Sequence, residues 1–196
     1  MKGLESIFPG THIILWQTEH VWRECFTEEE KKVLLDSNIP LSKEKMHLAA
    51  IVVDTKDFKE VKSYHRVITS PFAKHAQYVK LTIRVDRESE VTTESPLLSL
   101  SRDFFRWARG FELYSWGEDY KIISDNIELT QLPSFVETMR FHDIRHLFKA
   151  YGIPADEYLS STVLEYFDQK LIPQSDSPLD NCRSLATALK KLAQTV

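Results

Sequence analysis

The chain has 196 residues, of which 42% are hydrophobic and 28% are charged. This length is typical of one domain and this composition is globular, so we expect a single domain over residues 1–196 and exclude a disordered chain. The formal net charge of −4 argues against strong non-specific attraction to nucleic-acid backbones, although it leaves a local basic groove open.

The two cysteines, Cys25 and Cys182, are too few and too far apart for a disulfide framework. Reduced thiols in a reducing compartment are the expected state. Residues 1–10 lack the apolar core of a signal peptide, and no apolar run approaches membrane-spanning length. We therefore expect a soluble cytoplasmic protein without a membrane partner.

The first half of the chain reads mainly as strands. The β-branched, apolar run at 12–16 predicts a buried strand, and a capping box at 27–30 predicts a helix through about residue 35. Apolar residues at 47–54 predict a second strand, and the more alternating run at 61–68 predicts a half-exposed neighbour. These strands should pair as an antiparallel meander.

The second half reads as helices with one further strand. Apolar residues at helical spacing predict helices over 97–108, around 144–148 and over 179–193. The run at 111–116 predicts a strand, and a capping box at 162–165 predicts a short helix. Three strands followed by mixed helices and strands indicate an α/β or α+β three-layer domain.

Seven short segments of the chain together form a recognisable series of motifs. They read HIILWQTE at 12–19, KMHLAAIVVD at 45–54, HRVITSP at 65–71, HAQYVKLTI at 75–83, FFRW at 104–107, LYSWGED at 113–119 and DSPLDNCRSLA at 176–186. In order and spacing they resemble the DEDDh 3′–5′ exonuclease superfamily, in particular its sporulation-inhibitor-type branch. The resemblance spans nearly the whole chain. It implies a ribonuclease H-like three-layer α/β domain, in which helices flank a central mixed five-stranded sheet.

Members of that superfamily cleave phosphodiester bonds with two divalent cations, four carboxylates and a histidine base. The cations polarise the phosphate, generate hydroxide and stabilise the leaving oxygen. Because Mg²⁺ and similar hard cations need oxygen ligands with negative charge, loss of the carboxylates implies loss of the metals.

The first family motif, Asp-x-Glu, falls on Gln17 and Glu19. The Gln17 amide offers a neutral oxygen and cannot bridge two cations as a carboxylate does. Glu19 remains a residual metal-ligand candidate, and the alternative for it is an ordinary solvated carboxylate at a strand end.

The second motif is ambiguous by one residue. The family Asp falls on Tyr120, whereas Asp119 lies one position earlier, on an expected strand-to-helix turn. Asp119 is therefore a second residual metal-ligand candidate. Its alternative role is to begin a helix, since Asp is a favoured N-cap residue.

In the third motif, the family histidine falls on Asp176 and the last Asp falls on Asn181. A carboxylate at 176 cannot act as a neutral base in the way imidazole does. A shift of one residue would place Asp180 at the metal position and Ser175 at the histidine position. That register would spoil the apolar face of the helix.

Other residues have simpler structural interpretations. His142 and His146 lack the further ligands of a zinc site, so we expect them to be surface or hydrogen-bonded histidines. Asp143 should begin a helix. Core packing is expected for Trp16, Trp116 and Cys182. The basic stripe of Arg102, Arg106 and Arg109 is expected to be a solvated face, with phosphate contact as its alternative.

Three functions remain open from the sequence. The first is a catalytically inactive relative that binds a 3′ end of single-stranded RNA or DNA, or a protein partner, with no cofactor. The second is a still-active Mg²⁺- or Mn²⁺-dependent exonuclease with an altered site built from Glu19, Asp119, Asp176 and Asp180. The third is a protein-interaction subunit that binds no nucleic acid.

Overall fold

The computed structural model describes residues 7–20, 45–67, 96–126, 132–167 and 177–195. The strands are β1 (His12–His20), β2 (Lys45–Asp54), β3 (Glu60–Val67), β4 (Leu113–Ser115) and β5 (Phe141–Asp143). The α-helices are α3 (Pro96–Ala108), α4 (Asp119–Asn126), α5 (Arg145–Ala150) and α6 (Pro178–Thr195). Short 3₁₀ helices are η5 (Ser134–Thr138), η6 (Ala155–Glu157) and η7 (Val163–Phe167).

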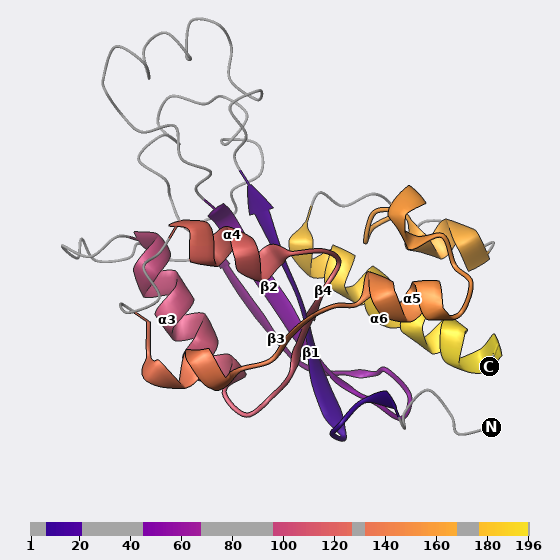
Figure 1. Cartoon of the computed structure of the whole chain (residues 1–196), viewed down its shortest axis with the longest axis horizontal. Coiled ribbons are helices and arrows are strands. Elements are labelled where there is room, and N and C mark those ends of the chain that lie inside the picture. The colour runs from indigo at the N-terminus through magenta and orange to yellow at the C-terminus, as the bar shows by residue number, and fades with distance from the viewer. Residues whose placement is uncertain (1–6, 21–44, 68–95, 127–131, 168–176, 196) are drawn as a thin grey trace, which may run out of the picture.

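The five strands form one mixed sheet in the order β3-β2-β1-β4-β5. β1 pairs antiparallel with β2, and β2 pairs antiparallel with β3, which confirms the predicted meander. β4 lies parallel to β1, and β5 lies parallel to β4. Figure 1 shows α3 and α4 on one side of the sheet and α5 and α6 on the other. The predicted three-layer α/β fold with a mixed five-stranded sheet is confirmed.

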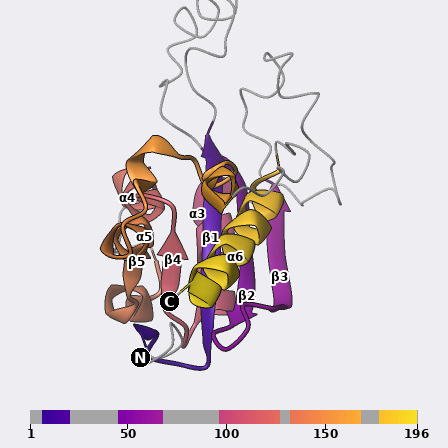
Figure 2. The same ribbon diagram turned by 90° about the vertical axis from the view of Figure 1, so that its right-hand side faces the viewer.

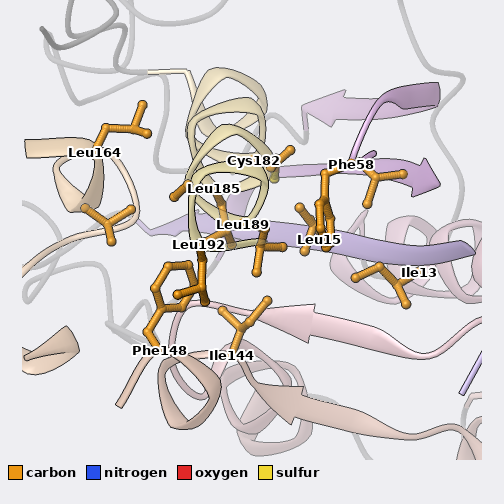
Figure 3. Packing of buried hydrophobic residues seen from close by; sticks show 14 of the residues in the cluster. Ile13, Leu15, Phe58, Ile144, Phe148, Leu164, Cys182, Leu185, Leu189 and Leu192 are labelled. Carbon is orange, nitrogen blue, oxygen red and sulfur yellow. The ribbon is translucent and has the colours of Figure 1, made fainter. Parts of the chain in front are cut away.

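One core layer lies between the sheet and α6, which crosses the face of β1 and β2 (Figure 2). Cys182, Leu185, Leu189 and Leu192 recur every three or four residues, so they share one face of the helix. Figure 3 shows these side chains turned toward Leu15 of β1. The odd-numbered residues of β1 therefore face α6.

The second core layer lies between the other face of the sheet and α3. The even-numbered Ile14 and Trp16 of β1 pack here with Phe104 and Phe105 of α3, all four at most 1% exposed. The Trp16 and Phe104 rings are stacked with centroids 5.3 Å apart. Trp16 is thus a core residue, as predicted from the sequence.

The predicted elements mostly differ from the observed ones at their ends. β1 runs on to His20, and β4 is shorter than the predicted strand at 111–116. At the predicted capping box a 3₁₀ helix follows Thr162, but the Thr162 hydroxyl accepts the backbone N–H of Leu159, three residues earlier, at 2.9 Å. The helix predicted after residue 27 lies outside the described residues. None of the described helices combines the length and apolarity needed to cross a bilayer.

Candidate functional site

Gln17 lies near the carboxyl end of β1, two residues beyond Leu15 on the face that α6 covers. Its side chain is half-buried, and its Oε1 accepts a hydrogen bond from Ser160 Oγ at 3.0 Å. Ser160 is 3% exposed and comes 143 residues later in the chain. The amide oxygen at the first motif position is therefore bonded within the protein. Of Glu19 the structure describes only the backbone, which belongs to β1.

Asp119 is the first residue of α4 and reaches back to the same strand. It is 7% exposed, and its Oδ1 accepts the backbone N–H of Thr18 at 3.0 Å. The Thr18 hydroxyl donates to the same oxygen. Thr18 lies between the two residues of the first motif, so the Asp119 carboxylate is bonded directly beside them.

Tyr120 points elsewhere. Its ring stacks on Phe141 of β5, with centroids 3.9 Å apart, and packs against the α3 core layer. Burial, with the Glu137 charge in addition, raises the pKa of Tyr120 above its ordinary value. Of the two residues that could match the second motif, Asp119 is the one that contacts β1.

The turn before Asp119 depends on Gly117 and Asp143. Gly117 has a φ of 110°, a conformation that favours glycine, and its N–H donates to Asp143 Oδ1 at 3.1 Å. The Asp143 carboxylate also accepts the N–H of Arg145, the first residue of α5, at 3.0 Å. Burial alone would raise the pKa of Asp143, but its hydrogen bonds and ion pair with Arg145 lower it. Asp143 is thus the last residue of β5 and joins two turns; the N-cap of α5 is Ile144, so the helix start predicted at Asp143 lies one residue later.

The beginning of α6 lies beside Gln17 and Asp119. Cys182 Sγ contacts the carbonyl oxygen of Ala49 at 3.7 Å, and Ala49 is the β2 partner of Gln17 in the sheet register. Burial, and then the charge of Asp119, raises the pKa of the Cys182 thiol well above its usual range. Asn181 precedes Cys182 on the helix and is half-buried. The three motif segments therefore come together, while Asp176 lies outside the described residues.

Asp180 takes part in a different set of contacts. Its Oδ1 accepts from Arg183 Nη1 at 3.2 Å, and Arg183 Nε also donates to Glu60 of β3 at 2.9 Å. Asp180 therefore belongs to an ion-pair network toward the edge strand β3. The alignment shifted by one residue would make Asp180 a metal ligand, but its carboxylate is paired with Arg183 instead. Ser175, which that alignment places at the histidine position, lies outside the described residues.

The residues of this site do not fit a pair of divalent cations. Gln17 and Asn181 are neutral amides, and Asp119 is already bonded to Thr18. Within the part of the chain that the structure describes, no three His, Cys, Asp or Glu side chains lie together in a way that could hold a metal ion. Even with Glu19, the family's four metal-binding positions and their immediate neighbours hold two carboxylates in this chain, Glu19 and Asp119. A pair of divalent cations would therefore share half of the four carboxylates that the family motifs place around them.

Sequence reasoning missed Thr18 and Ser160, which hold the two motif side chains in place. Thr18 could have been noticed because it lies between Gln17 and Glu19, but nothing in the sequence points to Ser160. His142 lies on β5 and not on a helix; its Nε2 is 2.9 Å from Glu112 Oε2, so it is hydrogen-bonded, as one of the two predicted alternatives stated.

No protein-family model matches the chain, and no curated protein matches it in sequence. Solved structures do match in fold. The nuclease domain of 3′hExo, a DEDDh family member bound to rAMP, has a TM-score of 0.63 at 12% identity, covering 94% of this chain and 92% of that one. A 3′-exonuclease in 3′-end-specific recognition of a histone mRNA stem-loop has a TM-score of 0.61 at 12% identity, covering 94% and 82%.

The cell-death related nuclease CRN-4 has a TM-score of 0.59 at 14% identity, and the match covers 95% of this chain and 65% of that one. These structures share the mixed five-stranded sheet with flanking helices that is described above. The chain therefore has the fold of DEDDh 3′-exonucleases.

Proposed function

We propose that this chain is a DEDDh-superfamily protein, of the sporulation-inhibitor-type branch, that no longer hydrolyses phosphodiester bonds and instead binds the 3′ end of a single-stranded nucleic acid. The proposal rests on one observation: the polar side chains of the first and second motifs, at positions 17 and 119, are hydrogen-bonded to other residues of the protein. Gln17 bonds Ser160, and Asp119 bonds Thr18. Two-metal hydrolysis needs charged oxygens that are available to cations at these positions.

The proposal extends to the other motif positions and to the whole chain. Asp176 and Asn181 would be the remains of a catalytic histidine and a metal-binding aspartate, and Glu19 and Asp119 the residual acids. Residues 1–196 would form one domain without a resident cofactor. A reducing compartment such as the cytoplasm is part of the proposal, because the two cysteines are too few and too far apart for a disulfide framework.

Two of the similar structures support binding at a 3′ end. One contains rAMP, and the other concerns 3′-end-specific recognition of an RNA. Both share the fold across almost the whole of this chain, so a comparable strand end could be bound near Gln17. Binding does not require the complete set of carboxylates, whereas hydrolysis does.

The direct test measures cleavage and binding on the same oligonucleotides. We expect no Mg²⁺- or Mn²⁺-dependent shortening of single-stranded RNA or DNA, and tighter binding to a 3′-hydroxyl end than to a 3′-phosphate end. Metal-dependent digestion that disappears in Glu19→Ala would show an active exonuclease with an altered site. If the protein bound no oligonucleotide at all, the remaining candidate function would be that of a protein-interaction subunit.

A repair experiment tests the assignment of the motif positions. We expect the variant with Gln17→Asp, Asn181→Asp and Asp176→His to be stabilised by Mn²⁺ in thermal unfolding, because a ligand that binds only the folded state stabilises it. Wild type should respond much less. Tyr120→Asp is left out because Tyr120 stacks on Phe141 and Asp119 already contacts β1.

A matched control adds two acids far from the site, as Gln194→Asp and Thr195→Asp at the exposed end of α6, and also carries Asp176→His, so that the net charge changes equally. This control should respond to Mn²⁺ as wild type does. Equal responses of the repaired chain and the control would contradict the motif assignment.

A further inference from the structure

A second group of functional side chains lies on the opposite face of the sheet from Gln17. Lys62 and Arg66 of β3 lie on the side of the sheet that α3 covers, because their β2 partners Val52 and Leu48 pack in the α3 core layer. Arg106 on α3 and Arg109 just after it are exposed, like Lys62 and Arg66. We call these four cations, with the half-buried Arg102, the α3–β3 surface. Figure 1 shows α3 on the side of the sheet away from α6.

Aromatic rings hold three of these cations in place. Lys62 Nζ lies 4.9 Å from the centroid of Trp107 and 5.2 Å from that of Phe111. The Arg66 guanidinium lies 5.3 Å from the Tyr64 ring, and that of Arg109 lies 5.0 Å from the Phe135 ring. A cation over a ring keeps its charge and can still donate hydrogen bonds outward. Because the side chains are already ordered, binding an anion costs less conformational entropy.

The charge of this surface differs in sign from that of the whole chain. The net charge is −4, yet α3 carries one acid, Asp103, whose ion pair with Arg106 spans 3.8 Å with both side chains 65% exposed. Such an exposed pair is weak and can be replaced by a phosphate. The acid of β3, Glu60, bonds Arg183 on α6 and so lies toward the other face. The positive charge is therefore local to the α3–β3 surface.

This surface fits a phosphate backbone better than a protein. Tightly bound protein partners usually need exposed apolar or aromatic anchors. Here the rings are partly buried and covered by cations. The large hydrophobic side chains that are exposed within the described residues are Ile7, Val61, Leu159 and Tyr166, which do not belong to the α3–β3 surface. Arginine and lysine donors without apolar anchors match phosphate oxygens.

We infer that the α3–β3 surface binds the sugar–phosphate backbone of a single-stranded nucleic acid, independently of its sequence and of its 3′ end. The choice of a nucleic acid as the ligand rests on the proposed function. The α3–β3 surface itself lies on the other face of the sheet from the Gln17 site. It would hold a strand whose end is bound elsewhere, or a strand without an end.

The test compares four variants by fluorescence anisotropy with an internally labelled single-stranded DNA, in linear and in circular form. The first replaces Lys62, Arg66, Arg106 and Arg109 by Gln. A control replaces Lys56, Lys59, Lys190 and Lys191 by Gln, on the β2–β3 turn and α6, so that the net charge changes equally. A third keeps the charges as Arg66→Lys, Arg106→Lys and Arg109→Lys. The fourth, Gln17→Ala, alters the other site.

Each lost phosphate contact lowers the slope of log affinity against log salt by about 0.7 for single strands, so four contacts correspond to about 3. We expect the first variant to lose this slope and on the order of tenfold or more in affinity for both forms of DNA. The control and the lysine variant should retain wild-type binding, and circular dichroism should show the same fold in all.

Equal loss in the first variant and the control would overturn the inference, as would failure of wild type to bind circular DNA. The experiment distinguishes failure of the proposed 3′-end binding from failure of backbone binding at the α3–β3 surface. Loss of 3′-hydroxyl preference in Gln17→Ala concerns the 3′-end site, whereas binding of circular DNA depends on the α3–β3 surface alone.

Discussion

Leu15 and Gln17 lie two residues apart on the same face of β1, but they belong to different regions of the molecule. Leu15 is fully buried against α6, while Gln17 is half-buried and bonds Ser160. The same contrast occurs on α6, where Cys182 packs in the core and its neighbour Asn181 lies beside the candidate site. Packing and site residues thus alternate on shared elements. Apolar contacts can keep the fold while the neighbouring polar positions change.

The core region should respond most strongly to substitution. Leu189 of α6 is 0% exposed, so Leu189→Ala should leave a cavity and lower the free energy of unfolding by about 3 kcal/mol. Leu159 is 67% exposed, and Leu159→Ala should change it by less than about 0.5 kcal/mol. Urea unfolding of the two variants measures the difference. Similar values would show that the α6 layer is not the core on which the fold depends.

Substitution of Asp119 tests whether this residue belongs to the structural core or to the candidate site. Its carboxylate is buried and accepts two hydrogen bonds from Thr18. Asp119→Ala leaves those donors without this acceptor, so we expect a loss of about 2 kcal/mol in unfolding free energy. Asp180→Ala, which breaks only a partly exposed ion pair with Arg183, should cost at most about 1 kcal/mol. A stabilising effect of Asp119→Ala would instead indicate an acid kept for chemistry at the expense of stability.

The pH dependence of stability tests a pair of histidines on the sheet face that α6 covers. His47 of β2 stacks there on His65 of β3, with ring centroids 5.9 Å apart. Burial, and then the charge of His65, lowers the pKa of His47 to about 4. An unfolded histidine has a pKa of about 6.5, so between these values the unfolded chain binds more protons and stability falls as the pH falls. The slope should approach about 1.4 kcal/mol per pH unit.

His47→Gln removes this titration and serves as the reference. Chemical unfolding at several pH values between neutrality and pH 4 should show a shallower loss of stability in the variant than in wild type. Carboxylates also titrate in this range, so the difference between the two proteins is the quantity that matters. Parallel curves would contradict the lowered pKa of His47.

The sequence predicted the regions with regular apolar patterns better than those built by turns. β2 and α6 follow from continuous or helical apolar spacing, and Cys182 was correctly assigned to the core. β5 was missed because it has three residues, all only half-buried, and so carries no periodic signal. The choice between Asp119 and Tyr120 depends on the direction of the chain after Gly117, which spacing does not encode. The Gln17–Ser160 bond joins residues too distant in sequence for any local pattern to reveal.

The smallest expected effect concerns the turn that directs Asp119 toward β1. Gly117 has a φ of 110° and Gly110 a φ of 90°, so an alanine at either position is strained, at a cost of about 1 kcal/mol. A Cβ at Gly117 would lie 3.6 Å from the Arg145 guanidinium, an ordinary contact, whereas one at Gly110 would meet nothing within 4 Å. We therefore expect Gly117→Ala and Gly110→Ala to lower the unfolding free energy almost equally. Thermal unfolding of the pair measures this. A much larger loss in Gly117→Ala would mean that the added Cβ displaces the Arg145 guanidinium and disturbs the Asp143–Arg145 pair, so that site and scaffold are coupled at this turn.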